Sequence, residues 1–500
     1  MLFSSTIFLF LFLPIVLALY FTVRPGLRNG VLLVASLFFY AWGEKALVAV
    51  LVLSIVSNWA LGVWVERAVR RGQGRRIVAG AVVFNVGLLV AFKYADWLWS
   101  ILGHGLVALG LTPGPLPELG SLLGSSSTWH DVLVTPHGHI RLPIGVSFFT
   151  FQATSYVVDV YRRDVEAEKS LVNFGMYKAF FPQLIAGPIV RYRDIHDQIR
   201  DRLVRREGFA LGVRRFILGL GKKVLIANAA ASCADAVFAI PAAELTAPVS
   251  WLGLVCYSLQ IYFDFSGYSD MAIGLGHMFG FTFLENFAHP YISKSITEFW
   301  RRWHISLSTW FRDYLYIPLG GNRVSRGRTY FNLLLVFFLC GLWHGAAFNF
   351  VVWGLWHGAF LVLERTGLGR GLERRTPLLR HAYVLLVVLV GWVFFRAPDL
   401  GYALSYLGAL AGLQAGAPLA WHVDLWLDPV LAAALLAGFV GSVPWVQELA
   451  AWHAQLEARG RRALGIALEL AATGALALVL LGSILELAAG SYNPFIYFRF

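Results

Sequence analysis

A histidine directly follows a tryptophan in two stretches, Ser295-Ile-Thr-Glu-Phe-Trp-Arg-Arg-Trp-His304-Ile-Ser-Leu-Ser308 and Leu339-Cys-Gly-Leu-Trp-His344-Gly-Ala346. An ionisable side chain at membrane depth must be stabilised by partners or retained for chemistry. Histidine can accept a proton near neutral pH. A single buried histidine is more often structural, but two such pairs, the first beside Arg301 and Arg302, indicate chemistry at least as well as packing.

The composition indicates a membrane protein. Of 500 residues, 58% are hydrophobic and only 14% are charged, with a mean hydropathy of +0.64. These values predict an all-α, polytopic integral membrane protein, with residues 1–500 forming one membrane domain. The net charge of +12 is spread over short basic clusters between apolar runs, which is the positive-inside pattern. No nucleic-acid motif accompanies them, so membrane lipid is the expected partner and nucleic acid is not.

The apolar runs predict about eleven to thirteen membrane-associated segments. The first run, 7–23, lacks a positively charged start and a cleavage site, so we expect it to be retained as a span. A basic cluster at residues 67–76 follows two runs that meet at a hinge over 43–45. If the basic clusters are cytoplasmic, the amino terminus is extracytoplasmic. The expected runs are 7–23, 31–42, 46–65, 77–92, 144–161, 211–227, 251–263, 331–342, 346–363, 382–395, 404–413, 429–443 and 463–489.

Two segments do not fit a simple span. Residues 174–190 are apolar but interrupted by Pro182, Gly187 and Pro188, with basic residues at both ends. Because broken backbone at membrane depth must be enclosed by protein or line a cavity, we expect this segment to be re-entrant and to form a wall of a central chamber. Residues 295–328 carry too many charges to span and should lie along the cytoplasmic face, with His304 near the membrane boundary.

The region 112–139 has no Lys or Arg and is rich in Pro, Gly and Ser, which predicts an external loop. Its histidines, His130, His137 and His139, could suggest a metal site, but a solvated loop is the simpler interpretation. We therefore expect no metal. Three cysteines without a Cys-x-x-Cys pattern likewise predict no disulfide framework.

The tetrapeptide Leu-Trp-His-Gly occurs twice, at 342–345 and 355–358. Thirteen residues make about 3.6 helical turns, so on one straight helix the two imidazoles would face different sides. One of the two histidines is then expected to be structural.

Several blocks in order resemble the membrane-bound O-acyltransferase family, in particular its bacterial branch that exports acyl groups to polysaccharides. The signature-like segment is 299–323, beginning Phe-Trp-Arg-Arg-Trp-His and ending Leu-Gly-Gly-Asn-Arg. The other blocks are 142–152, 181–191, 260–270 and the carboxyl end, 493–500. The internal blocks lie at about 140–360, with peripheral helices over 1–110 and 380–490.

The resemblance implies a bundle of helices around a chamber, an O-acyltransferase activity and a catalytic role for His344. His344 would act as the base, His304 would orient the donor or donate a hydrogen bond, and His357 would be structural. Substrate or donor contacts are expected at Trp303, Arg301, Arg302, Arg312, Trp343, Asp264 and Asp270. Arginine binds phosphate groups well, although anchoring to lipid headgroups is an equal alternative for the arginines. The two carboxylates could equally serve only to bond helix ends or nearby hydroxyls.

The resemblance also implies the substrates, the partners and the location. The donor would be acetyl-coenzyme A or another acyl thioester, with no bound cofactor. The acceptor would be alginate or a similar exopolysaccharide; peptidoglycan, cellulose or D-alanylated teichoic acid are alternatives. An extracytoplasmic polysaccharide acetyltransferase and other polymer-synthesis proteins would complete delivery, at the bacterial inner membrane. The sequence has no Gly-x-Ser-x-Gly motif near either histidine and no P-loop. A multi-spanning transporter is the rival class, but no convincing repeat relates the two halves.

Overall fold

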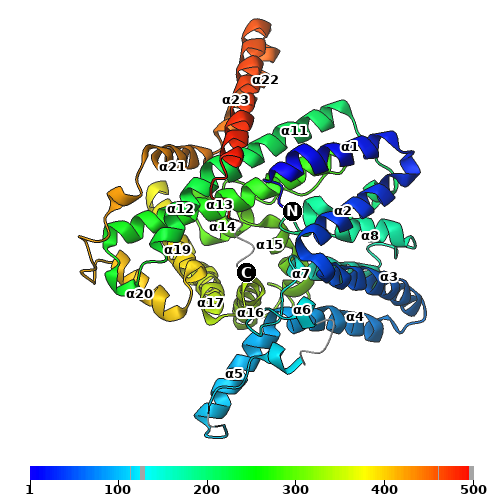
Figure 1. The fold of residues 1–500 in the computed structure, drawn as a ribbon, viewed down its shortest axis with the longest axis horizontal. Helices are drawn as coiled ribbons and strands as arrows, with labels where there is room; N and C mark the ends of the chain where they lie inside the picture. Colours follow the sequence, from blue (N-terminus) through cyan, green and yellow to red (C-terminus); the bar gives the residue numbers. More distant parts are fainter. Residues whose placement is uncertain (113, 124–129, 460, 495–500) are drawn as a thin grey trace. The chain divides into compact units, whose positions relative to one another are not determined.

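The computed structural model describes residues 1–112, 114–123, 130–459 and 461–494. Over these residues the fold is all-helical, and its only strand-like pairing is a single bridge between Val134 and Ile140 (Figure 1). The all-α fold class is therefore confirmed. The chain forms two compact units. The first unit comprises Met1–Leu2, Ile7–Val204 and Gly280–Phe283; the second comprises Phe3–Thr6, Arg205–Phe279 and Leu284–Phe500. A single domain over 1–500 stays a prediction.

The first unit contains helices α1 to α10. Its expected hinge is confirmed at Lys45, whose φ of 51° and ψ of −125° end α2 before α3 begins. A buried amide pair joins α3 to α4, since Asn58 and Asn85 each donate a side-chain hydrogen bond to the other, at 2.9 and 2.7 Å. Such pairs hold helices together where water is absent. The helices are α1 (Leu13–Thr22), α2 (Arg28–Glu44), α3 (Val48–Arg70), α4 (Gly74–Leu89), α5 (Ala95–Ala108), α6 (His130–Leu133), α7 (Val146–Arg162), α8 (Leu171–Ala179), α9 (Phe181–Leu184) and α10 (Tyr192–Arg200).

The interrupted segment 174–190 is broken and buried, as expected. Helix α8 ends at Ala179 and the single turn α9 stops at Leu184, and the side chains from Phe174 to Val190 are buried. Side chains satisfy part of the broken backbone: Gln183 donates to the Tyr177 carbonyl, and the Tyr177 hydroxyl donates to the Val190 carbonyl at 3.2 Å. The side from which it enters the membrane, and its part in a chamber, stay predictions.

The second unit is built on two long helices. Helix α11 (Arg206–Gly221) continues through a π-helical turn, Lys222–Ala227, into α12 (Asn228–Val237), and it packs along α13 (Ala247–Met278). The two helices approach so closely that a Cβ at Gly219 would lie 2.5 Å from the Gly267 carbonyl oxygen. Small residues allow this approach between membrane helices. Helix α13 is longer than the expected run 251–263, because it continues through Asp264 and Asp270.

Six of the remaining helices of the second unit follow expected apolar runs, two short ones lie in the charged segment 295–328, and another, Gly369–Glu373, lies between runs. Helix α22 was not predicted from the sequence, since its charged and polar residues interrupt the apolar pattern; it lies beside α23 (Figure 1). The helices are α14 (Ile296–Arg302), α15 (Ile305–Phe311), α16 (Arg326–His344), α17 (Phe348–Leu363), α18 (Gly369–Glu373), α19 (Pro377–Arg396), α20 (Leu400–Leu410), α21 (Pro429–Gly441), α22 (Trp445–Ala458) and α23 (Arg462–Ala488).

Five helices in the described part of the chain are long and apolar enough to cross a membrane, or up to six if the pair Pro429–Gly441 and Trp445–Leu456, bent by 57°, counts as one span. The five are Pro25–Arg70, Gly74–Ala108, Arg206–Val237, Pro377–Arg396 and Arg462–Ala488. The other apolar helices are shorter or more polar, so the expected eleven to thirteen membrane-associated segments stay a prediction. The expected external loop is described except for residues 113 and 124–129.

Candidate active site

His304 lies between two short helices of the second unit, α14 and α15. Its backbone is left-handed, with φ 44° and ψ 56°, a conformation that is unfavourable for a residue with a side chain. The imidazole is fully buried. Its neighbours are the ring of Phe265, at 4.6 Å between centroids, and the ring of Trp343, at 6.1 Å. The second unit therefore encloses the ring of His304, and its position near a membrane boundary stays a prediction.

The two nitrogens of His304 have different surroundings. Nδ1 lies 3.1 Å from Oδ1 of Asn286, whereas Nε2 has no hydrogen-bond partner within the described residues. Burial lowers the pKa of His304 to about 3, because a charged ring would lose its hydration. The ring is therefore neutral near pH 7, with one unoccupied nitrogen.

His344 is the last residue of α16, and three aromatic rings enclose it. The centroids of Trp343, Trp353 and Phe395 lie 4.9, 5.0 and 5.1 Å from that of His344. At the following residue, Gly345, a Cβ would lie 2.2 Å from the Phe350 ring, so the absence of a side chain there allows that ring to pack.

Trp343 connects the two predicted catalytic histidines. Its ring contacts that of His304, 6.1 Å away, and that of His344, 4.9 Å away. The side chain of Trp343 is itself buried. The structure therefore places the rings of His304 and His344 against the same side chain, that of Trp343.

The two Leu-Trp-His-Gly copies lie on different helices. The chain breaks after His344, and α17 folds back along α16, where a Cβ at Gly341 would lie 2.3 Å from the Phe350 carbonyl oxygen. The argument from one straight helix therefore does not apply, because the two histidines lie on separate helices, as the separate runs 331–342 and 346–363 predicted. His344 and His357 both contact the ring of Trp353, at centroid distances of 5.0 and 5.3 Å.

His357 is fully buried, and neither of its ring nitrogens has a hydrogen-bond partner among the residues described. It stacks over Phe299, at 6.4 Å, and meets the edge of Trp300, at 5.1 Å. Helix α19 approaches it at Gly391, where a Cβ would lie 2.6 Å from Nε2. A structural role for His357 stays a prediction, and this close packing supports it.

The predicted donor contacts have other partners in this structure. Trp303 is buried against Phe299 and Trp392, at centroid distances of 5.6 and 4.9 Å. Arg302 pairs with Glu298 at 2.9 Å and donates to the Ala288 carbonyl at 3.0 Å.

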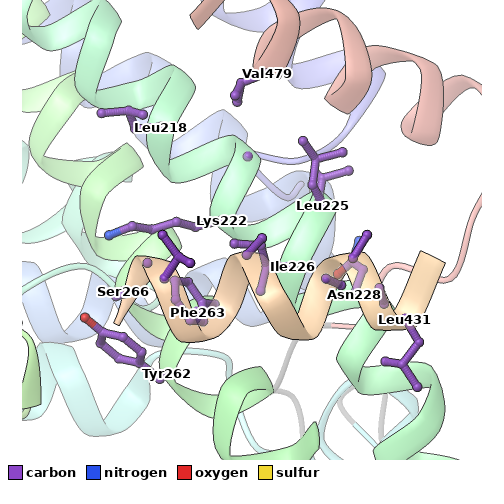
Figure 2. Close-up of a pocket in the computed structure, with 18 of the residues that line it drawn as sticks. Leu218, Lys222, Leu225, Ile226, Asn228, Tyr262, Phe263, Ser266, Leu431 and Val479 are labelled. Atoms are coloured by element: carbon purple, nitrogen blue, oxygen red, sulfur yellow. The ribbon is translucent and has the colours of Figure 1, made fainter. Parts of the chain in front are cut away.

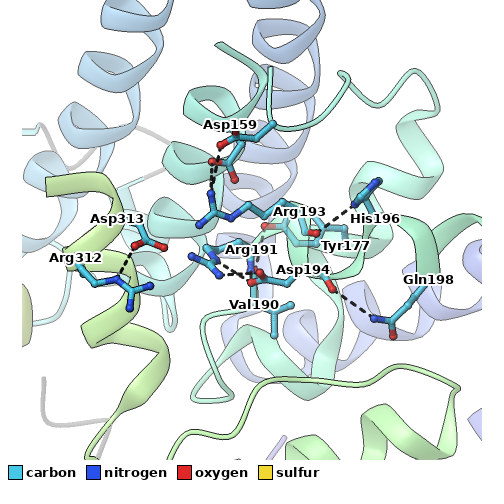
Figure 3. Close-up of polar contacts among 11 residues, drawn as sticks. Asp159, Tyr177, Val190, Arg191, Arg193, Asp194, His196, Gln198, Arg312 and Asp313 are labelled. Carbon is cyan, nitrogen blue, oxygen red and sulfur yellow. Dashed lines mark hydrogen bonds and ion pairs between the residues drawn. The ribbon is translucent and has the colours of Figure 1, made fainter. Parts of the chain in front are cut away.

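The other two arginines reach the surface. Arg312 pairs with Asp313 at 2.7 Å (Figure 3), and Arg301 is exposed. Among the described residues, Arg302 and Arg312 each have an ion-pair partner, whereas none is found for Arg301. A donor-binding role for each of them stays a prediction.

Both predicted carboxylates lie on α13 and form ion pairs with the helix beside it. Asp264 lies 2.7 Å from Lys223 Nζ, and each side chain is 2% exposed. Asp270 lies 2.8 Å from Arg215 and 2.7 Å from Lys222. These partners, which no sequence pattern identified, explain why α13 continues through two acidic residues.

A cavity of about 1470 Å³ in the second unit lies beside this acidic end of α13. Figure 2 shows Lys222, Tyr262 and Phe263 among its lining residues, together with apolar side chains from α11, α21 and α23. Tyr262 also contacts the ring of Trp303, at 6.2 Å. Tyr262 thus belongs both to the wall of the cavity and to the group of aromatic rings around Trp303.

The first unit has a polar cluster of its own, whose basic residues served above only as a marker of topology. Arg191 caps α10 through paired hydrogen bonds to Asp194, both at 2.8 Å (Figure 3). Arg193 lies 3.5 Å from the fully buried Asp159. Two of the basic residues after 190 therefore form ion pairs within this unit, one at the start of α10 and one with α7.

In the parts of the chain that the structure covers, no group of three His, Cys, Asp or Glu side chains is arranged to hold a metal ion. His139 lies 3.2 Å from Glu118 and 3.9 Å from Asp96, and His130 lies 3.5 Å from Asp131. These loop histidines are therefore paired with acidic neighbours.

Comparison with known proteins gives the family. Residues 138–391 match the membrane-bound O-acyltransferase family, MBOAT. The chain is 42% identical over 511 residues, covering 100% of both chains, to the "Probable alginate O-acetylase AlgI" of Pseudomonas putida. It is 34% identical to the peptidoglycan O-acetyltransferase of Helicobacter pylori, over 83% of this chain and 80% of that one. It is also 29% identical to the teichoic acid D-alanyltransferase of Bacillus subtilis, over 50% and 64% respectively.

The matched region contains His304, His344 and the helices that carry them. The activity indicated by the family and by these relatives is acyl transfer, as expected from the sequence, and the apolar helices make the chain a membrane protein. With a family match over more than half its length and high identity over all of it, this chain belongs to the membrane-bound O-acyltransferase family.

Proposed function

We propose that this membrane O-acyltransferase passes an acetyl group from acetyl-coenzyme A toward the hydroxyl groups of an exopolysaccharide, with alginate as the first candidate. Identity over the full length to proteins named as alginate O-acetylases supports the polymer. The donor is cytoplasmic and the polymer is extracytoplasmic, so the protein works across the inner membrane. Its amino terminus is extracytoplasmic, as the distribution of basic clusters indicates.

The observation that carries the chemistry is the pair of buried histidines separated by Trp343. Acyl transfer from a thioester needs a group that accepts the proton of the attacking hydroxyl. In our proposal a ring nitrogen of His344 takes this proton while the hydroxyl oxygen bonds to the acyl carbon. The carbon–sulfur bond then breaks, and the thiolate receives the proton to leave as coenzyme A. His304, whose ring also contacts that of Trp343, assists this reaction.

Delivery to the polymer needs other proteins in this proposal. An extracytoplasmic polysaccharide acetyltransferase receives the acyl group, and polymer-synthesis proteins supply the chain that it modifies. No bound cofactor is required, because the thioester already provides the activated acyl group. The exposed Arg301 is the first candidate for contact with the donor's phosphates, since arginine suits phosphate recognition.

A second candidate acceptor is peptidoglycan, which the 34% identity to the Helicobacter pylori enzyme favours. The two acceptors are distinguished by measuring O-acetyl groups in both polymers from the same cells, with and without this protein.

His344→Asn tests the proposal. General-base catalysis typically contributes about 10²–10⁴-fold, so O-acetylation of the polymer should fall to near background at normal protein abundance. The matched control is His357→Asn, in the second Leu-Trp-His-Gly copy, which should keep its activity per folded molecule. The O-acetyl content of purified polymer, divided by the amount of protein in the membrane, is the measurement. Near wild-type acetylation by His344→Asn would remove the proposed mechanism.

A further inference from the structure

The loop that follows α13 runs directly beside His304. Two backbone hydrogen bonds hold it there: the Ala288 N–H donates to the Arg302 carbonyl at 3.0 Å, and the Ile305 N–H donates to the Asn286 carbonyl at 2.9 Å. They place the side chain of Asn286 against the imidazole. Asn286 is buried, with 1% of its surface exposed. No pattern in the sequence singles it out.

The orientation of the Asn286 amide follows from a backbone group. Its Oδ1 lies 3.3 Å from the backbone nitrogen of Ser306, which can only donate. The atom facing it must therefore be the amide oxygen. On its other side, the amide nitrogen of Asn286 donates to the hydroxyl of Ser269 at 3.0 Å. The two ends of the amide are thus fixed by separate partners.

The orientation of the amide in turn decides which nitrogen of His304 carries the proton. Oδ1 of Asn286 lies 3.1 Å from Nδ1 of His304 and can only accept, so Nδ1 must be the N–H. A neutral imidazole has one N–H, and Nε2 is therefore the nitrogen with the free lone pair. Nε2 is also the buried ring atom that has no partner among the described residues.

We infer that Asn286 is a positioning residue, which holds His304 as the Nδ1–H tautomer so that Nε2 is available as a hydrogen-bond acceptor in acyl transfer. The inference rests on the proposed function. Of the two roles expected for His304, it excludes donating a hydrogen bond from Nε2 of the neutral ring. Nε2 can instead accept a hydrogen bond from an N–H or O–H of the bound substrates other than the attacking hydroxyl, whose proton goes to His344. Because the amide is uncharged, it orients the ring without stabilising a protonated imidazole.

Asn286→Asp tests this role, because it keeps the shape and the acceptor but adds a negative charge beside Nδ1. An opposite charge at this distance favours the protonated ring by about one to three pKa units. Protonation would occupy Nε2 at acidic pH. Starting from about 3, the pKa of His304 would rise to as much as about 6, so the kcat for acetyl transfer should fall by up to about tenfold more between pH 8 and pH 5 than in the wild type. The assay uses membranes that contain the native polymer-synthesis proteins, with radiolabelled acetyl-coenzyme A as the donor.

The matched control is Asn332→Asp. Asn332 is fully buried in the same unit, and its amide donates to the Leu319 and Gly321 carbonyls, away from either predicted catalytic histidine. Its variant can lower the amount of folded protein, but the pH profile per molecule should remain that of the wild type. If the two variants have the same pH profile, the inference is wrong.

Two further variants complete the test. If Asn286→Asp does not reach the membrane, Ser269→Ala removes only the partner of the amide nitrogen. It should lower kcat several-fold with an unchanged KM for acetyl-coenzyme A, and an unchanged kcat would overturn the inference. His304→Ala separates the proposed function from the inference. If it retains full activity, the proposed role of His304 fails; if it is inactive while Asn286→Asp follows the wild-type pH profile, only the inference about Asn286 fails.

Discussion

Removing one member of the buried ion pair between α11–α12 and α13 should strongly destabilise the protein, whereas removing both should not. Lys223 and Asp264 lie 2.7 Å apart with 2% of each side chain exposed, and Lys223 also donates to the Pro494 carbonyl. Lys223→Met leaves the Asp264 carboxylate buried without its cation. The double variant Lys223→Met/Asp264→Asn removes both charges and nearly preserves the shapes.

The magnitude follows from the burial of the pair. Breaking a buried ion pair by removing one partner costs about 3–5 kcal/mol, because an uncompensated charge remains. At about 1.4 kcal/mol for each factor of ten, the ratio of unfolded to folded protein should rise by a factor of about 10² to 10³ or more. Replacing both charges is often neutral or stabilising, so most of this loss should be recovered in the double variant.

The assay is unfolding of the purified protein in mild detergent as the fraction of denaturing detergent is increased. Polymer acetylation per folded molecule is measured in parallel. We expect the double variant to be active, because the pairing of Asp264 indicates a structural role. A double variant as unstable as Lys223→Met would refute the account of the ion pair. A stable but inactive double variant would instead show that the charge of Asp264 serves the reaction.

Three other outcomes are expected. A cysteine introduced at the exposed Arg71 should be protected from an impermeant thiol reagent in intact cells, whereas one at the exposed His137 should be labelled. The three native cysteines are buried and should not react with the reagent. The reverse labelling pattern would show that the predicted membrane orientation is wrong. Arg302→Ala should lower the amount of folded protein without raising the KM for acetyl-coenzyme A, because its guanidinium is engaged by Glu298; a raised KM would instead assign it to donor binding. His304 has a pKa of about 3 in the folded protein, below its usual 6.5, so the unfolded chain binds the extra proton between these values and stability should fall as the pH drops below about 6.5. Thermal midpoints in detergent at about pH 7.5 and 4.5 check this, and an equal drop in His304→Gln would rule the histidine out as the cause.

The sequence predicted features that depend on local pattern. The hinge at Lys45 and the break within 174–190 were visible, because glycine and proline interrupt apolar runs there. The helix α13 was predicted too short, because Asp264 and Asp270 seemed unsuited to a buried helix. Their cations come from more than 40 residues earlier in the chain, and such pairing is not visible in a local pattern.

The candidate site was predicted in part for the same reason. His304 and His344 stood out because each is a titratable group beside tryptophan in an apolar chain. Their connection through Trp343 depends on how α14 and α15 pack beside α16, which spacing alone does not give. Asn286 carries no signal in the sequence, since its role follows only from a loop folded against His304.

The left-handed backbone of His304 sets stability against activity at one position. That conformation costs about 1–3 kcal/mol for a residue with a side chain, and a buried nitrogen without a partner among the described residues adds to the cost. Glycine adopts the same conformation freely and buries no polar ring. A selection for thermostability alone would therefore favour replacing His304, and the surviving variants would fold better while losing turnover. Programmes that stabilise this enzyme for purification should hold position 304 fixed and look for gains elsewhere.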